Sequence, residues 1–213
     1  MPGTYFQVEV RYPGEWLDIK ELVQPESYAV KMALAKVYNS AQTLEQNIWN
    51  CWDFVCREID YPPAGDYHRR EAFPTQGLFG RSLVSQSTQD FWSFPFETLG
   101  LGIGDCEDSS ILLCSMLRNF RGANEVDVTI GYYDRPHPSL GHAWVTIKRA
   151  GQRYVLEPTL RNALPTIYQV PEAAPYLPYI RFNDLLHIEE RPGFVLGPRD
   201  KRFKHERMSE LYG

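Results

Sequence analysis

The sequence predicts an α+β fold, in which helices come first along the chain and an antiparallel sheet follows. Apolar residues recur at helical spacing in two segments before residue 60 and in one after residue 104. Segments rich in β-branched and aromatic residues, separated by short turns, follow residue 125. The 213 residues, 43% hydrophobic and 23% charged, suit one globular domain with a sizeable core. Helices grouped before strands are typical of the α+β class.

Two helices are expected near the N-terminus. The first covers residues 27 to 38, where apolar side chains recur every three or four positions. The second opens after Thr43, because the threonine hydroxyl can cap the first turn together with Gln46. Consecutive prolines at 62 and 63 end this helix, since proline lacks an amide donor.

A long segment without periodicity follows, over residues 61–104. We expect an irregular or lightly helical loop there, and loops of this length in compact domains usually bind ligands or act as lids. After a third helix, strands are predicted at 126–133, 142–148, 153–157 and 179–182. We therefore expect a single domain over 1–197, with its core at about 42–190 and an N-terminal helical extension, and a charged tail over 198–213.

Composition excludes several function classes. The net charge of −5 is the wrong sign for a surface that neutralises phosphates, so nucleic-acid binding is not expected. The longest apolar run, Ile111 to Leu117, is far shorter than the ~20 residues that a membrane span needs. The first thirty residues hold no signal-peptide core, and the four cysteines form no CxxC pair. A reduced, cytoplasmic protein is the expectation, with no membrane partner.

The third helix, from Asp105 to about Phe120, opens with the sharpest local motif, Gly104-Asp105-Cys106-Glu107-Asp108. Cys106 falls in the first helical turn, where the helix dipole can lower a thiol pKa from ~8.5 into the range ~3.5–7.5. The neighbouring carboxylates oppose ionisation by repulsion. A thiolate here therefore needs a histidine partner.

Two histidines are candidates for that partner, His137 in a loop and His142 at the start of a strand. The next strand carries Glu157. A two-residue turn at Arg149-Ala150 would place His142 directly opposite Glu157, whereas a turn at Ala150-Gly151 would make them diagonal neighbours on one face. A turn of odd length without a bulge would put them on opposite faces.

Cysteine, histidine and glutamate together make a nucleophile, a base and an orienting carboxylate. The first amides of the cysteine helix are placed to stabilise an oxyanion. A side-chain donor is expected from the preceding loop, with three candidates: Trp92, Gln89 and Gln86. Trp144, next to His142, either lines the substrate groove or shields the triad.

At these residues the sequence resembles the transglutaminase-like superfamily of papain-like cysteine enzymes, and within it the bacterial transglutaminase-like cysteine proteinases. The resemblance covers roughly residues 42–160 in four blocks, which are 92–99, 104–108 with its helix, 141–144 and 156–159. It implies a papain-like core with the catalytic cysteine at a helix start, packed on an antiparallel sheet. It also implies the triad Cys106, His142 and Glu157, where Glu stands in place of the usual Asp.

The resemblance bears on cofactors too. Some of the bacterial proteinases bind calcium through acids flanking the cysteine, and Asp105 and Glu107 match those positions. Calcium normally takes six to eight oxygens, and few can be named here. Helix capping and surface charge explain both acids without a metal, so no cofactor is expected.

The leading functional hypothesis is a cysteine-dependent peptidase or amidase that forms an acyl-thioester with a protein or peptide substrate. One alternative is a cross-linking acyltransferase, in which an amine replaces water. Hydrolysis is preferred because a single small domain lacks the extra β-domains of the animal cross-linking enzymes. The other alternative is a non-catalytic module that keeps the groove to bind a peptide. Residue preference and oligomeric state stay open.

Overall fold

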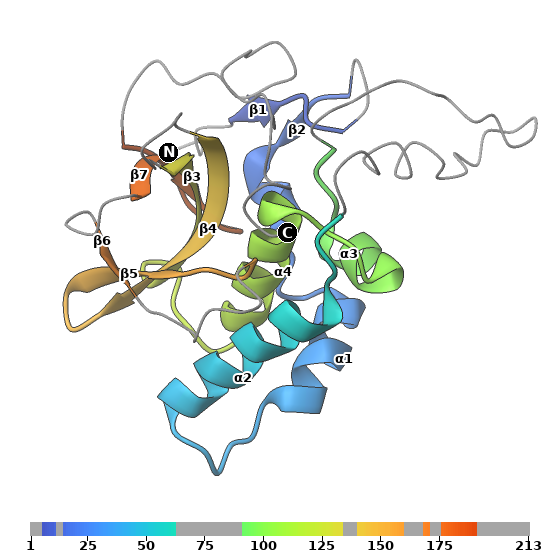
Figure 1. The fold of residues 1–213 in the computed structure, drawn as a ribbon, viewed down its shortest axis with the longest axis vertical. Coiled ribbons are helices and arrows are strands. Elements are labelled where there is room, and N and C mark those ends of the chain that lie inside the picture. Colours follow the sequence, from blue (N-terminus) through green and yellow to red (C-terminus); the bar gives the residue numbers. More distant parts are fainter. Residues whose placement is uncertain are drawn as a thin grey trace, which may run out of the picture.

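The computed structural model describes residues 6–11, 15–62, 91–133, 140–159, 168–170 and 176–190 (Figure 1). Within this part of the chain, helices precede a six-stranded antiparallel sheet, and the predicted α+β class is confirmed. No helix among these residues combines the length and apolarity that crossing a bilayer requires. The tail expected over 198–213 lies outside the described residues.

The first two predicted helices are present as α1 (Tyr28–Val37) and α2 (Leu44–Glu58). The predicted cap of α2 is confirmed: the amide of Gln46 donates to Thr43 Oγ1 at 3.2 Å, and the amide of Thr43 donates to Gln46 Oε1 at 3.0 Å. This reciprocal pair satisfies amides that the first helical turn leaves without partners.

The cysteine helix α4 (Cys106–Leu117) lies at the centre of the fold, against β3 and β4 on one side and α1, α2 and α3 on the others (Figure 1). All residues of this helix are buried, because a helix surrounded by other elements has no solvent face. The charged residues of its first turn are therefore buried as well.

The main sheet has the strand order β6-β5-β4-β3-β7-β8. Its strands are β3 (Val126–Tyr133), β4 (Leu140–Arg149), β5 (Gln152–Leu156), β6 (Tyr168–Val170), β7 (Tyr176–Phe182) and β8 (His187–Glu189). The β4–β5 turn is Ala150-Gly151, where both residues have positive φ, 47° and 83°. This is the second of the two turns considered from the sequence, and it pairs Val145 with Leu156.

The segment before the cysteine contains a short helix that the sequence did not resolve, α3 (Pro95–Leu101). Seven residues give too few turns for a hydrophobic period to show. Pro95 suits the first helical position, and Glu97 accepts the Phe94 amide at 2.7 Å. Arg11 binds Glu97 through two 2.7 Å hydrogen bonds and the backbone oxygen of Trp92 at 2.8 Å. The N-terminal segment thereby anchors α3.

This N-terminal segment forms a second, two-stranded sheet from β1 (Gln7–Val8) and β2 (Leu17–Asp18), followed by the short 3-10 helix η1 (Ile19–Leu22). These elements were not predicted, because strands of two residues carry no alternation that a sequence can reveal.

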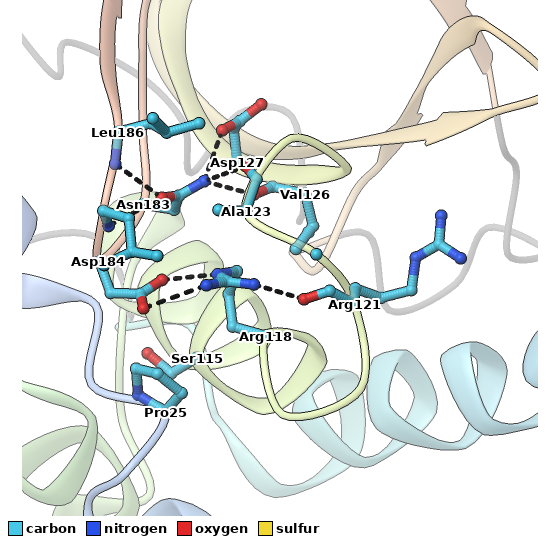
Figure 2. Close-up of polar contacts among 12 residues, drawn as sticks. Pro25, Ser115, Arg118, Arg121, Ala123, Val126, Asp127, Asn183, Asp184 and Leu186 are labelled. Carbon is cyan, nitrogen blue, oxygen red and sulfur yellow. Dashed lines mark hydrogen bonds and ion pairs between the residues drawn. The ribbon is translucent and has the colours of Figure 1, made fainter.

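A polar cluster ties the far end of α4 to the sheet (Figure 2). Asn183, after β7, donates to the backbone oxygens of Ala123 and Val126 and to Asp127 Oδ1, at 2.7, 3.0 and 2.9 Å. Arg118, after the last turn of α4, donates to both carboxylate oxygens of Asp184. These bonds fix how α4 lies along the sheet, and so where its first residue, the cysteine, meets β4.

Candidate active site

The approach to the cysteine helix is shaped by two glycines. Gly102 has φ of 64° where α3 ends, a conformation that favours glycine. A Cβ on Gly104 would lie 2.9 Å from the Cβ of Asp108, so no side chain fits there. Asp60, after α2, brackets this turn: its amide donates to the oxygen of Gly102 at 2.7 Å and its oxygen accepts from the amide of Gly104 at 3.0 Å. Gly102, Gly104 and Asp60 thus form a tight turn before the helix.

Asp108 joins the helix start to the preceding segment. Its Oδ2 accepts the Asp105 amide at 3.3 Å, at the cap of the helix. Its Oδ1 accepts the Ser93 amide at 2.7 Å, a bond that the sequence did not predict. One buried carboxylate therefore fixes residues 91–94 beside the first turn of α4.

The Cys106 thiol is enclosed by protein. The residue is 3% exposed, and its thiol donates to Glu107 Oε2 at 3.2 Å. The backbone of Ala143, the residue after His142, hydrogen-bonds the sulfur. The cysteine at the start of α4 thus lies directly against β4.

The charge state of Cys106 differs from the thiolate expected at a helix start. Burial raises the pKa of this thiol well above its usual range, and the carboxylates of Glu107 and Asp105 raise it further, against the opposing Ala143 hydrogen bond. Asp105 and Glu107 are 1% and 4% exposed, so their interpretation as surface charge is wrong. Both acids are enclosed because α4 is surrounded, and the resting thiol is neutral.

His142 and Glu157 are brought together by the β4–β5 register. Their Nε2 and Oε2 atoms are 2.6 Å apart, and both side chains are buried. The Ala150-Gly151 turn makes the two residues diagonal neighbours on one face, as the even-turn prediction required. Within the described residues His142 Nδ1 is buried and makes no hydrogen bond.

The tautomer of His142 follows from the charge on Glu157. Although burial by itself raises the pKa of Glu157, contacts with His142 and Thr159 lower it below its usual value. The carboxylate is therefore ionised and accepts a hydrogen bond from Nε2–H of His142. The lone pair of the imidazole lies on Nδ1, where it can act as a base.

Three further groups hold the Glu157 region. The amide and hydroxyl of Thr159 donate to Glu157 Oε1 at 3.1 and 2.6 Å, and the hydroxyl of Tyr176 donates to Oε2 at 3.2 Å. From α2, the indole of Trp52 donates to the backbone oxygen of Glu157 at 2.7 Å. The carboxylate and its backbone are both fixed.

Sequence reasoning assigned none of these roles. Thr159 lies within the 156–159 block, and a hydroxyl two residues after Glu157 was the signal that could have suggested its role. Tyr176 had no signal, because β7 was predicted to begin at residue 179.

Aromatic rings surround the imidazole. The rings of Trp144, Tyr176 and Tyr133 have centroids 6.1, 6.4 and 5.8 Å from that of His142. Trp144 is fully buried, as a residue that shields the His142–Glu157 pair would be, and a role in the substrate groove stays a prediction.

The predicted oxyanion donors cannot all be placed. Trp92 is buried and stacks on Phe182 of the core with ring centroids 6.4 Å apart. Its role as an oxyanion donor stays a prediction. Gln89, Gln86 and His137 lie outside the described residues.

The described residues contain no group of three or more histidine, cysteine or acidic side chains able to hold a metal ion. Asp108, the third acid of the motif, uses both oxygens on backbone amides. The expectation of no cofactor stays a prediction.

Neither a protein-family model nor a curated protein matches the sequence. Among solved structures, the chain is similar to Legionella pneumophila LapG, with 16% identity, a TM-score of 0.43, and coverage of 79% of this chain and 88% of that one. A calcium-bound form of LapG gives 16% identity, a TM-score of 0.42 and coverages of 83% and 95%. A candidate cysteine protease from Cytophaga hutchinsonii gives 17% identity, a TM-score of 0.40 and coverages of 76% and 49%.

Proposed function

We propose that this chain is a cysteine-dependent peptidase or amidase in which Cys106 is the nucleophile, His142 the general base and acid, and Glu157 the orienting carboxylate. One observation carries the proposal. The buried imidazole of His142 hydrogen-bonds the ionised carboxylate of Glu157 through Nε2, which leaves Nδ1 to take a proton. The next residue, Ala143, contacts the Cys106 thiol through its backbone.

In the first half-reaction, His142 Nδ1 takes the proton from the thiol as the sulfur attacks the carbonyl carbon of the substrate. The carbonyl oxygen becomes an oxyanion, which the amide of Cys106 at the helix start is placed to stabilise. The C–N bond then breaks, and the imidazolium gives its proton to the leaving amine. An acyl-thioester on Cys106 and a free amine are the products.

In the second half-reaction, Nδ1 removes a proton from water, and the resulting oxygen nucleophile attacks the thioester carbon. The C–S bond breaks, the sulfur recovers the proton, and a carboxylic acid leaves. In both halves the imidazole becomes positively charged, and Glu157 stabilises that charge through the 2.6 Å bond.

The raised thiol pKa gives the histidine a specific task. A neutral, buried thiol is a poor nucleophile. Proton transfer to His142 during attack removes the need for a standing thiolate. The enclosed sulfur also means that the site must open for a substrate to reach it.

Incubation with casein and the fluorescent amine monodansylcadaverine tests the choice of acceptor. Hydrolysis gives new chain termini in mass spectra without dye incorporation, and this is the expected result. Dye on glutamine side chains would instead support the acyltransferase alternative. The matched Cys106→Ala variant should give neither product.

A non-catalytic peptide-binding module is the second candidate, and the enclosed, neutral thiol favours it. Alkylation by iodoacetamide separates the two. In an enzyme, the alkylation rate of Cys106 should fall when His142 is replaced. In a binding module, the rate should be that of an ordinary thiol and should not depend on His142.

The expectation of no cofactor needs its own test, because one LapG structure is described as calcium-bound. Adding calcium to protein pre-treated with EGTA should leave the alkylation rate of Cys106 unchanged. A calcium-dependent rate would overturn that expectation and point to Asp105 and Glu107.

A further inference from the structure

A glutamate in the orienting position raises a geometric question, because its side chain has one more torsion than aspartate. An unrestrained carboxylate would sample several rotamers and lose the imidazole. Yet Glu157 is 3% exposed and lies 2.6 Å from His142. Some feature of the fold must restrict it.

Thr159 restricts one carboxylate oxygen. Its amide and hydroxyl both donate to Oε1, at 3.1 and 2.6 Å, and the residue is 6% exposed. The backbone of this turn is itself fixed, because Cys56 on α2 hydrogen-bonds the oxygen of Pro158 at 3.2 Å. Oε1 is therefore attached to a rigid part of the protein.

Tyr176 restricts the other oxygen from a different strand. Its hydroxyl donates at 3.2 Å to Oε2, the atom that also accepts from His142. The Tyr176 ring is 2% exposed and packs against Trp144, with centroids 5.0 Å apart. It cannot turn away without disturbing that packing.

Gly131 lets the strand that carries Tyr176 approach. Gly131 lies at a register shift between β3 and β7. On the other edge of β3 it pairs directly with His142 of β4. A Cβ on Gly131 would lie 2.0 Å from the backbone oxygen of Leu177 and 2.9 Å from Trp144. β7, the strand that carries Tyr176 and Leu177, can come this close to β3 only because residue 131 has no side chain.

From these contacts we infer that Thr159 and Tyr176 are positioning residues for the triad, an assignment that rests on the proposed function. Together they hold the Glu157 carboxylate so that a glutamate can fix the imidazole of His142. Both act through Glu157.

The assignment has a consequence for pH dependence. Hydrogen bonds to a carboxylate favour its charged form, and Thr159 contributes to the lowered pKa of Glu157. The orienting charge is present above that pKa and is lost as the pH falls through it. Removing a donor raises the pKa, so reactivity that needs the charge should be lost at higher pH.

Few other titratable groups face this carboxylate in the described part of the chain. They are His142 from β4, Tyr176 from β7, Tyr133 from β3 through its ring contacts with both, and the Cys56 thiol from α2 on the adjoining Pro158. The carboxylates of Glu107 and Asp105 also act on the Cys106 thiol. The assignment therefore rests on the difference between each variant and the unmodified protein.

The experiment measures the rate constant for alkylation of Cys106 by iodoacetamide from about pH 4 to pH 9 in the full chain. Thr159→Val and Tyr176→Phe each remove one hydroxyl, and Thr159→Ser keeps it. Thr129→Val is the matched control, because Thr129 is a buried threonine that bonds Thr146 at 2.6 Å. Circular dichroism checks that each variant is folded.

The acid midpoint is the pH at which the alkylation rate constant has fallen to half on the acid side. We expect Thr159→Val to raise this midpoint by about one pH unit, as loss of a hydrogen bond to a charged group implies. Tyr176→Phe should move it less, because its bond is longer, and Thr159→Ser should restore it. Thr129→Val should leave it in place. A role in stability alone would not move the midpoint.

Unchanged midpoints in both Thr159→Val and Tyr176→Phe would overturn the assignment. If Thr159→Val does not fold, Tyr176→Phe decides by itself. Failure of the proposed function looks different: the unmodified protein would then alkylate no faster than a His142→Ala variant, whatever Thr159 and Tyr176 do.

Discussion

The indole of Trp52 donates to the backbone oxygen of Glu157 at 2.7 Å, across 105 positions of sequence. This bond joins the middle of α2 to Glu157, the residue that follows β5. The distance between α2 and the sheet therefore also sets the position of Glu157 relative to His142.

Trp52→Phe should lower His142-dependent alkylation of Cys106 by about tenfold, because the freed Glu157 backbone can shift and the lost bond is worth ~1–2 kcal/mol. Trp49→Phe on the same helix is the matched control, since Trp49 packs edge-on against Trp52 and is only partly buried. Equal losses in both variants would show that the Trp52 bond has no special role.

Glu107→Gln should speed alkylation of Cys106 at neutral pH by several-fold. After burial, the Glu107 charge is the next cause that raises the pKa of the thiol, and the amide removes that charge at similar size. Glu45→Gln provides the control, because Glu45 is an exposed acid paired with Arg149. A rate unchanged by Glu107→Gln would contradict the assigned cause.

Gly104→Ala should destabilise the fold by ~1–3 kcal/mol, because the new Cβ would crowd Asp108, Ile59 and Thr98 within 3.1 Å. Gly100→Ala, in α3 with nothing within 4 Å of its added Cβ, should instead be neutral or stabilise by up to ~1 kcal/mol. Urea unfolding measures both. Similar losses in the two variants would argue against the close packing of Gly104.

Alkaline pH should destabilise the protein through its buried thiols. Burial raises the pKa of Cys51 from 9.0 to about 12, so the folded state keeps a proton that the unfolded state releases above about pH 9. Stability is therefore complete below that pH and falls as the pH rises toward 12, by ~1.4 kcal/mol per unit.

The urea midpoint of Cys51→Ala, compared at pH 7 and pH 10, checks this assignment. The cavity left by the substitution costs the same at both values, so the variant should lose less stability than the unmodified protein between them. An identical loss in the two proteins would remove Cys51 as a cause.

Much of this arrangement could be predicted from the sequence, because local patterns determine it. The alternation of side chains along the two strands predicted that His142 and Glu157 share one face of the sheet, provided that the turn between the strands has an even number of residues. The sequence left two such turns open. Backbone conformation decided between them, since Ala150 and Gly151 both adopt positive φ.

The remainder depends on contacts between distant segments. Burial of Asp105 and Glu107 follows from the elements that surround α4, which no local pattern records. The bonds from Thr159 and Tyr176 to Glu157 need the packing of β7 on β3. The position of Cys106 at a helix start predicted a lowered thiol pKa. Burial by distant segments raises it instead.

The most direct test of the account compares the alkylation rate of Cys106 at about pH 6 in the unmodified protein and in His142→Ala, with modified cysteines located by mass spectrometry. If the imidazole takes the thiol proton, the unmodified protein should react at least tenfold faster, with the added modification located on Cys106. Equal rates in the two proteins would contradict the pairing of Cys106 with His142.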